Sequence, residues 1–345
     1  MPDPVTETTG TAPLTLVVMG ASAGGVETLR RVVRDLPADL PAAVCVVLHI
    51  APGAPSALAA ILGRAGSLPC RAVGDHETLR QGEILVAPPD RHVVIDDGHV
   101  ALSSGPRENG HRPSVDALFR SAAENLDGRV IGVVLSGTRD DGTAGLAVVK
   151  ANGGLAVVQD PEEALYGGMP RNAIAHVPVD AVVPSGQIAN TIVHMVNGDW
   201  AQRAAEPDPA GDDQDGDPVI TTCPECGGVL SEQPQTGLTQ WQCKVGHRYS
   251  PESLADAQAE GVEATIWAAV RALEDRQQLL ERIARQSEGR GHSAAARVFR
   301  QRAEQAREQA VAVRRALEQS LGSTLRPVGD ELAGELSDEP GQAQL

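Results

Sequence analysis

Residues 14–197 alternate short, continuously apolar runs with amphipathic stretches, and this alternation restricts the chain to few fold classes. Runs of Val, Leu and Ile without polar alternation are typical of strands that are buried on both faces of a sheet. We predict such strands at residues 14–19, 43–49, 84–87, 129–136, 155–159 and 181–183. Helical spacing predicts helices between most of them, at residues 26–36, 55–62, 114–125, 142–151 and 187–196. The pattern therefore indicates an α/β fold with a doubly wound, mostly parallel sheet.

One segment departs from this alternation. Residues 92–96 and 99–102 form two short apolar runs that are joined by Asp97-Gly98, a dipeptide that favours a two-residue hairpin turn. We therefore expect an antiparallel hairpin within the otherwise parallel architecture.

The charge and hydropathy of the chain exclude several classes of function. A net charge of −17 argues against a nucleic-acid-binding protein, which normally carries a basic stripe. No run approaches the roughly 18 to 20 apolar residues that a membrane span requires, and the N-terminus lacks a basic start and an apolar secretory segment. We expect a soluble, cytoplasmic protein without membrane insertion.

A glycine-rich turn, GASAGG at residues 20–25, follows the first predicted strand and leads directly into a helix. A sharp strand-to-helix turn of this kind exposes the Ser22 hydroxyl beside the first free amides of the helix. This context favours a nucleophile elbow, but similar turns in α/β proteins bind phosphate groups. The turn alone does not distinguish these two functions.

A serine nucleophile needs a base and usually a carboxylate, and the chain supplies both at the ends of other predicted strands. His49 ends the second strand, and Asp140 and Asp141 follow the strand at 129–136 after a short turn. Because the carboxyl ends of parallel strands share one edge of the sheet, we expect these side chains to converge on Ser22. Their order, Ser, His, Asp, differs from the Ser, acid, His order of α/β-hydrolases.

Other polar residues of this region are weaker candidates. His111 opens the segment HRPSVD, in which Ser114 is a candidate helix cap and Arg112 a candidate ligand for a substrate carboxylate. Three histidines lie in or beside polar loops or the hairpin and are expected to be exposed: His76, His92 and His99.

Four sequence blocks follow one another within residues 14–197. They are GASAGGVETL, VVLH, VAPPDRHVVI with HRPSVDALFRSAA, and VIGVVLSGTRDDGTAGL with VVQDPEEALYGGMPRNAI. Together they resemble the catalytic domain of the chemotaxis protein-glutamate methylesterases. The resemblance implies that Ser22 is the nucleophile, His49 the general base and Asp141 the carboxylate that orients it. It also implies a cofactor-free serine esterase that hydrolyses glutamyl methyl esters on chemoreceptors, with deamidation of glutamine by the same acyl transfer.

The chain departs from this family in three ways. Ala23 replaces a residue that is often threonine, so backbone amides near Ala23–Gly25 are left to stabilise the oxyanion. Thr138-Arg139 replaces the Met-Gly of the family ahead of the acid. The catalytic region begins at Leu14 without the usual receiver domain, and we therefore expect no control by phosphorylation of such a domain.

Three of the five cysteines predict a metal site. Cys223 and Cys226 form a CxxC pair, and Cys243 stands four residues before His247. Two such knuckles supply the four ligands of a tetrahedral structural zinc, and four protein ligands leave no open position for catalysis. Chance clustering of three cysteines is the alternative. Cys45 and Cys70 have no close partner and are expected to be packing residues or unreactive thiols.

The remaining segments complete the expected domain organisation. Apolar residues at helical spacing, beginning at Val262 and resuming at Phe299, predict two helices that are separated at Gly289 and Gly291 and share a coiled-coil-like seam. Such a helical hairpin favours a homodimer or partner docking, although an intramolecular hairpin needs neither. The expected segments are a disordered N-terminus (1–13), a methylesterase domain (14–197), an acidic linker (198–218), a zinc-ribbon-like unit (219–250), a helical hairpin (251–322) and a disordered tail (323–345).

Two other functions compete with the esterase. One is a weakly active or inactive relative that serves as a zinc and coiled-coil interaction module in signalling. The other is nucleotide binding by the glycine-rich turn. A dinucleotide site would require an acidic residue at the end of the second strand, and His49 stands there instead.

Overall fold

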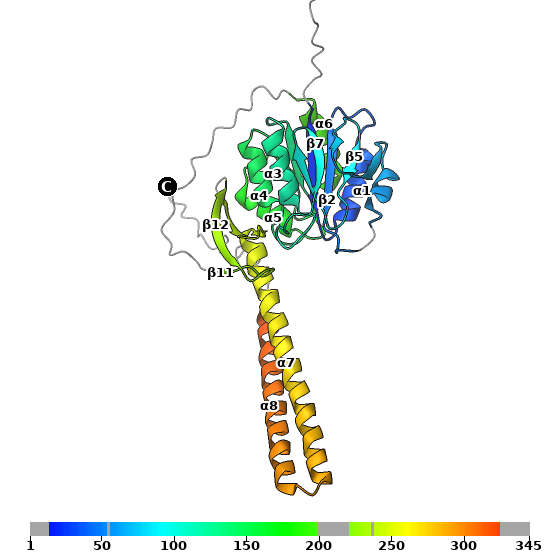
Figure 1. Ribbon diagram of the computed structural model, residues 1–345. Helices are drawn as coiled ribbons and strands as arrows, with labels where there is room; N and C mark the ends of the chain where they lie inside the picture. Colours follow the sequence, from blue (N-terminus) through cyan, green and yellow to red (C-terminus); the bar gives the residue numbers. More distant parts are fainter. Residues whose placement is uncertain (1–13, 54–55, 199–220, 236–237, 325–345) are drawn as a thin grey trace, which may run out of the picture. The chain divides into compact units, whose positions relative to one another are not determined.

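The computed structural model describes residues 14–53, 56–198, 221–235 and 238–324 (Figure 1). The predicted disordered N-terminus lies outside the described residues, as do all but the first residue of the predicted linker and all but the first two of the predicted tail. The chain divides into two compact units, Met1–Ala255 and Asp256–Leu345. No described helix is long and apolar enough to cross a membrane.

A parallel sheet forms the centre of the first unit. Its strands are β1 (Leu16–Ala21), β2 (Ala43–Leu48), β3 (Cys70–Ala72), β5 (Ile84–Val86), β8 (Val130–Val134), β9 (Leu155–Gln159) and β10 (Ala181–Val183). They lie in the order β10-β9-β8-β1-β2-β5-β3, and every neighbouring pair is parallel. The chain proceeds from β1 to β2 on one side and later returns to β8 on the other, so the carboxyl ends of β8, β1 and β2 border the point where strand order reverses.

Helices cover both faces of this sheet, as the continuous burial of its strands requires (Figure 1). One face packs against α1 (Gly25–Asp35), α2 (Leu58–Gly63) and α6 (Ser185–Val196). The other packs against α3 (Val115–Asn125), α4 (Thr143–Ala151) and α5 (Gly168–His176). The predicted α/β fold with a mostly parallel, doubly wound sheet is confirmed.

The predicted hairpin belongs to a separate antiparallel sheet. Strands β6 (His92–Asp96) and β7 (His99–Ser103) pair with each other, and β4 (Glu77–Thr78) pairs with β7. Apolar side chains of the hairpin join the core on the α3 face. The sequence patterns did not predict β3, β4 or α5, because β3 and β4 are very short and α5 contains Pro170 and few apolar residues.

A second antiparallel sheet, which we call the C-terminal sheet, also belongs to the first unit. It consists of β11 (Thr221–Thr222), β12 (Val229–Gln235), β13 (Leu238–Cys243) and β14 (Arg248–Tyr249), paired in sequence order. Tyr249 is buried, whereas Trp241 is half-buried. All four residues of the predicted zinc site lie in this sheet or in the turns that connect its strands.

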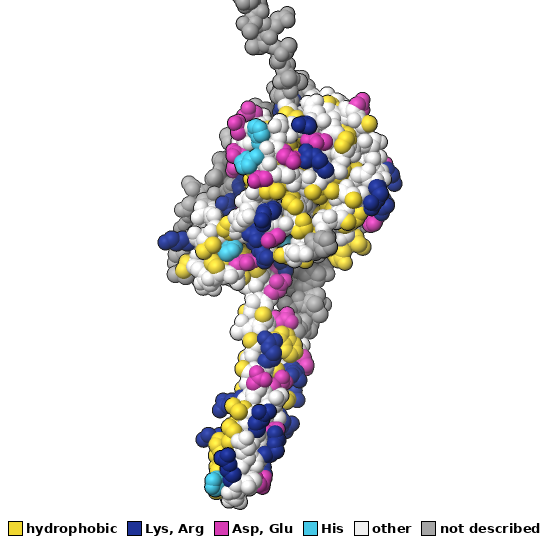
Figure 2. Space-filling model, turned by 45° about the vertical axis from the view of Figure 1, so that its right-hand side comes forward, with side chains coloured by type: hydrophobic (Ala, Val, Ile, Leu, Met, Phe, Trp, Pro, Cys, Tyr) yellow, Lys and Arg dark blue, Asp and Glu magenta, His cyan; other side chains and the backbone are white. Residues whose placement is uncertain are grey.

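The second unit is formed by two long helices, α7 (Pro251–Gly289), which begins in the first unit, and α8 (Ser293–Thr324). The turn between them contains Gly291 at a φ of 81°. Figure 2 shows basic and acidic side chains interspersed along these helices, with hydrophobic ones between them. Small buried side chains such as Ala303 and Ala306 lie in the seam, whereas Val262, predicted to belong to it, is 60% exposed. The prediction that Val262 belongs to the seam was therefore wrong.

Candidate active site

Ser22 lies at the carboxyl end of β1, in the turn that leads into α1. Its amide donates to the carbonyl of Ser136, and its own carbonyl accepts from the amide of Gly25. Gly24 has a φ of 74°, and a Cβ there would come within 2.8 Å of the Ser136 hydroxyl and 2.9 Å of Leu165 Cβ. Only glycine fits both the backbone conformation and the narrow space at position 24, and it allows the sharp turn. In this turn the Ser22 side chain is half-buried.

The structure brings Ser22, His49 and Asp141 together. His49 follows β2 and Asp141 precedes α4, so the three residues come from the ends of adjacent strands. The Ser22 hydroxyl lies 3.1 Å from His49 Nδ1, and His49 Nε2 lies 2.7 Å from a carboxylate oxygen of Asp141. The side chains of His49 and Asp141 are 6% and 2% exposed. This is the geometry of a nucleophile, a base and an orienting carboxylate.

Asp141 is held as an ionised acceptor by donors from several segments. Burial opposes its ionisation, but the hydrogen bonds from His49 and the Val115 amide and the nearby imidazoles hold its pKa well below the usual range. Five groups donate to its two oxygens: His49 Nε2, the amides of Val115 and Asp116, the Ser114 hydroxyl and Asn109 Nδ2. The amides belong to the start of α3, so the partial positive charge of that helix end also favours the carboxylate.

His111 stacks on the ring of His49. The two ring centroids are 3.7 Å apart and the rings are inclined by only 14°. Burial and the neighbouring His49 lower the pKa of His111 to about 4, so His111 is neutral near pH 7. The stacked ring restricts the rotation of the His49 imidazole.

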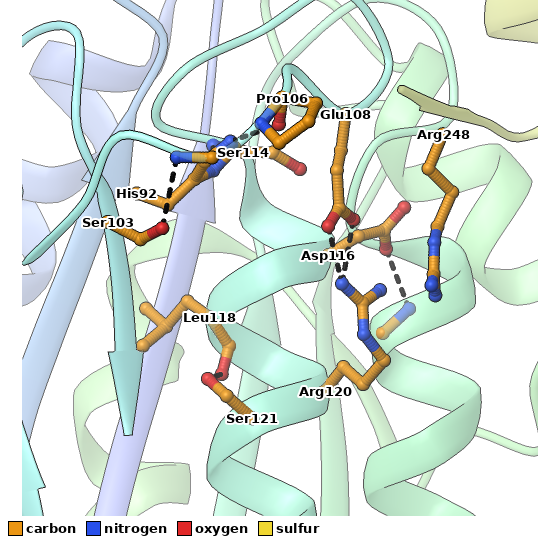
Figure 3. Close-up of polar contacts among 12 residues, drawn as sticks. His92, Ser103, Pro106, Glu108, Ser114, Asp116, Leu118, Arg120, Ser121 and Arg248 are labelled. Carbon is orange, nitrogen blue, oxygen red and sulfur yellow. Dashed lines mark hydrogen bonds and ion pairs between the residues drawn. The ribbon is translucent and has the colours of Figure 1, made fainter. Parts of the chain in front are cut away.

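Several candidates from the sequence take other roles. His92 is 3% exposed, so its predicted exposure was wrong: it accepts from the Ser114 amide and donates to the Pro106 carbonyl, which fixes its tautomer (Figure 3). The Arg112 guanidinium binds Asp90 and two backbone carbonyls, and those contacts occupy the groups proposed for a substrate carboxylate. Ser114 makes no side-chain cap on α3 and donates to Asp141 instead.

The sequence patterns missed two polar residues beside Asp141. Asn109 donates to both Asp141 and Asp116, and Asp116 accepts from the amides of Gly142 and Gly145. Both side chains are buried. Asn109 has a φ of 53°, a conformation that asparagine tolerates better than most residues. An asparagine in a polar loop is common, however, so the sequence pattern does not predict this contact.

The four predicted metal ligands also come together. The ligand atoms of Cys223, Cys226, Cys243 and His247 all lie within 4.8 Å of one another. The Cys226 and Cys243 sulfurs are 3.7 Å apart, and His247 Nδ1 is 3.6 Å from the Cys223 sulfur and 3.5 Å from that of Cys243. Ligand atoms of a tetrahedral zinc lie about 3.5 to 3.8 Å apart, given the usual metal–ligand distances. The donor set and its spacing therefore fit zinc.

Cys45 and Cys70 lie apart from both sites, in the parallel sheet. Burial raises the pKa of the Cys45 thiol to about 12 and that of Cys70 to about 11. Both are free cysteines, and neither ionises near neutral pH.

Comparison with known proteins supports the resemblance of this region. The sequence profile of the CheB methylesterase family matches residues 17–192. A putative protein-glutamate methylesterase/protein-glutamine glutaminase of Leptospira interrogans is 36% identical over 54% of this chain and 97% of its own length. A protein-glutamate methylesterase/protein-glutamine glutaminase of Anaeromyxobacter dehalogenans is 40% identical over 52% of this chain, but the match spans only 53% of that protein.

A solved structure also resembles about half of the chain. The crystal structure of the Thermotoga maritima CheB methylesterase catalytic domain is matched over its whole length and over 53% of this chain, with 32% identity and a TM-score of 0.51. The residues that the family profile matches contain the carboxyl ends of β8, β1 and β2 and the three side chains that converge there. The chain belongs to the CheB methylesterase family.

Proposed function

We propose that this protein is a protein-glutamate methylesterase that hydrolyses glutamyl methyl esters on chemoreceptor-like proteins. The observation that carries the proposal is the continuous contact from the Ser22 hydroxyl through His49 to Asp141, with distances of 3.1 and 2.7 Å. The names of the relatives support the substrate class. The glutaminase in those names corresponds to the same acyl transfer with ammonia as the leaving group.

The contacts define a sequence of proton transfers. The His49 Nε2–H donates to Asp141, so Nδ1 carries the lone pair that accepts the Ser22 proton as the hydroxyl attacks the ester carbon. The protonated imidazole then donates to the departing methoxy group, and methanol leaves behind an acyl-serine. Water repeats the attack with His49 again as base, which releases the glutamate side chain and restores Ser22.

Backbone amides at the start of α1 are the donors best placed for the oxyanion. The Gly25 amide already donates to the Ser22 carbonyl. The amides of Ala23 and Gly24, in the same turn, therefore carry this role in our proposal, aided by the helix end. Ala23 has no hydroxyl to add to them.

Apolar side chains beside the nucleophile suit a protein substrate. Leu165 and Tyr166 are 75% and 46% exposed in the loop before α5. The Tyr166 amide donates to the Ser136 hydroxyl, and the Ser136 carbonyl accepts from the Ser22 amide, so the loop is tied to the nucleophile turn. We propose that this loop contacts the receptor segment that carries the ester.

The esterase proposal is tested by labelling and turnover. A fluorophosphonate probe is expected to modify Ser22, and Ser22→Ala should abolish both labelling and methanol release from a methylated receptor. Ser56→Ala, in a different loop, serves as a matched control and should retain both activities. Methanol release at the wild-type rate from the Ser22→Ala protein would exclude the proposed nucleophile and favour an interaction module.

We further propose that Cys223, Cys226, Cys243 and His247 hold a structural zinc ion. The short distances among the ligand atoms support a tetrahedral site, and four protein ligands leave no open position for catalysis. Metal analysis is expected to find about one zinc per chain. A metal content near zero, with all three thiols open to titration, would contradict this.

The exposed apolar side chains of the helical unit support a proposed homodimer. Val262, Leu279 and Val298 are 60%, 58% and 47% exposed. Light scattering should then give twice the chain mass, and charged substitutions at these positions should return the monomer. A monomeric wild-type protein at micromolar concentration would exclude the homodimer.

A further inference from the structure

The buried side chain of Asn109 connects the C-terminal sheet to Asp141. Its Nδ2 donates to Asp141 Oδ1 at 2.9 Å and to Asp116 Oδ2 at 2.8 Å. Its Oδ1 accepts from the amide and the hydroxyl of Ser250, the residue after β14, at 2.9 and 3.0 Å. We propose that Asn109 is a positioning residue through which the C-terminal sheet orients the catalytic acid, an inference that rests on the esterase function proposed above.

Ser250 determines which end of the Asn109 amide faces the carboxylates. A carboxamide can rotate by 180° and exchange its oxygen with its nitrogen. The two Ser250 donors fix the oxygen on their side, so both N–H groups must face Asp141 and Asp116. Without those donors, the amide loses the contact that holds this orientation, and a rotated oxygen would face the Asp141 carboxylate.

The backbone of Asn109 is attached to the same sheet. Its amide donates to the Arg248 carbonyl at 2.8 Å, and the Arg248 amide donates to the Arg107 carbonyl. On the neighbouring side, Glu108 accepts two hydrogen bonds from Arg120 of α3, and the Arg248 side chain lies beside this ion pair (Figure 3). The loop that carries Asn109 is thus held between α3 and β14.

A second contact reaches the residue next to the acid. Asp140 is buried and accepts from the Glu252 amide and the Ser253 hydroxyl, at the start of α7. Its carboxylate therefore caps the first turn of α7. Ser250, Glu252 and Ser253 lie three to six positions after His247, so one short segment connects the predicted metal site to both Asp140 and Asn109.

This arrangement gives the C-terminal sheet a function in the reaction. Asp141 is held partly by donors at the start of α3 and partly, through Asn109, by the C-terminal sheet. The same sheet carries the predicted Cys3His metal site. If that sheet lost its contacts with Asn109, the Asn109 side chain would no longer hold the Asp141 carboxylate in one orientation. Proton transfer at His49 would then be slower. The hydrogen bonds that tie the loop of Leu165 and Tyr166 to residues 136 and 137 do not involve that sheet, so we expect substrate binding to be retained.

The test uses the full-length chain and three variants. Asn109→Gly removes the side chain while tolerating the φ of 53°. Ser250→Ala removes one of the two donors to its oxygen. Ser231→Ala is the matched control, because its hydroxyl donates to the Gln242 carbonyl within the same sheet and is exposed. Each is measured for the rate of fluorophosphonate labelling at Ser22, for kcat and KM, and for the NMR resonance of the proton between His49 and Asp141.

We expect Asn109→Gly to lower kcat and the labelling rate about 10- to 100-fold with KM unchanged, by analogy with the loss that follows removal of a group that orients a metal ligand. Ser250→Ala should lower them about 3- to 10-fold, which corresponds to one neutral hydrogen bond. Both should shift the His49 proton resonance, and Ser231→Ala should change nothing. Folded Asn109→Gly and Ser250→Ala proteins with wild-type kcat and resonance would overturn the inference.

A double-mutant cycle tests the route through Asn109. Cys226→Ser, which removes a predicted metal ligand, should lower the labelling rate in the wild-type background but hardly in the Asn109→Gly background. Fold losses that simply multiply would overturn the inference. A wild-type protein that is not labelled at all would instead overturn the esterase proposal itself, and the two failures are therefore distinguishable.

Discussion

Asp141 and Asp116 exchange hydrogen bonds between the starts of α3 and α4. Asp141, just before α4, accepts from the amides of Val115 and Asp116 in the first turn of α3. Asp116 accepts in return from the amides of Gly142 and Gly145 at the start of α4. Burial and the charge of Asp141 raise the pKa of Asp116 well above its ordinary value. The negative charge of the pair therefore resides on Asp141, where the proposed reaction needs it.

This exchange makes Asp116 important for stability. Asp116→Ala is expected to lower the free energy of unfolding by about 2 to 4 kcal/mol, because it leaves buried N–H donors without partners at the start of α4. Urea unfolding measures the loss, with the exposed Glu27→Ala as control. A change of less than about 0.5 kcal/mol would show that α4 does not depend on this cap.

Asp141 should matter for rate more than for binding. Asp141→Asn keeps the size of the side chain, but the amide no longer selects the His49 tautomer that carries its proton on Nε2. We expect kcat for methanol release to fall about 10⁴-fold, the scale of this substitution in serine hydrolase triads. The surface substitution Asp39→Asn is the control, and a loss below about tenfold would rule out Asp141 as the orienting acid.

His111 should make stability depend on pH. Its pKa in the folded chain is about 4, below the ordinary value of 6.5, so the folded protein favours the neutral ring. Its contribution is fully present above pH 6.5 and is lost as the pH falls toward 4. We expect His111→Gln to remove about 2 kcal/mol of the difference in unfolding free energy between pH 7 and pH 5.

Urea unfolding at the two pH values measures this difference. The exposed His99→Gln should leave it as in the wild type. An equal pH dependence in the wild type and the His111→Gln protein would show that the ring is not held neutral by the fold.

The nucleophile turn should require glycine at position 24. Gly24→Ala combines a φ of 74° with contacts below 3.0 Å to Ser136 and Leu165, so it should cost at least about 1 to 2 kcal/mol and displace Ser22. Gly186→Ala is the matched control, since a Cβ there meets nothing within 4 Å and lies inside α6, where alanine is favoured. Unfolding curves and the labelling rate together measure both effects. Equal results for the two variants would contradict a strained turn at Gly24.

The local patterns of the chain predicted the parallel sheet and most of its helices. They also predicted which polar side chains lie at the carboxyl ends of the strands. Ser22 and His49 could be named in advance because each stands at the end of a strongly apolar run, and Asp140 and Asp141 because they follow another such run after a short turn. Strand direction places all of them at one edge of the sheet, and the family resemblance selected Asp141. The Cys and His spacing predicted the group of Cys223, Cys226, Cys243 and His247 for a similar reason, since these residues lie in two short segments. Short strands such as β3 and β4 were missed because they lack periodicity.

The surroundings of the acid were decided by tertiary structure alone. His92 lies in a polar-looking hairpin but is buried, because Ser114 and Pro106 supply partners for both ring nitrogens. Asn109 and Ser250 are 141 positions apart, and no local pattern in either segment predicts their contact. The sequence by itself thus determined which residues can perform the chemistry, since strand-end positions follow from local periodicity. Only the packed chain decided what holds them in place, because buried hydrogen bonds depend on which distant segments meet.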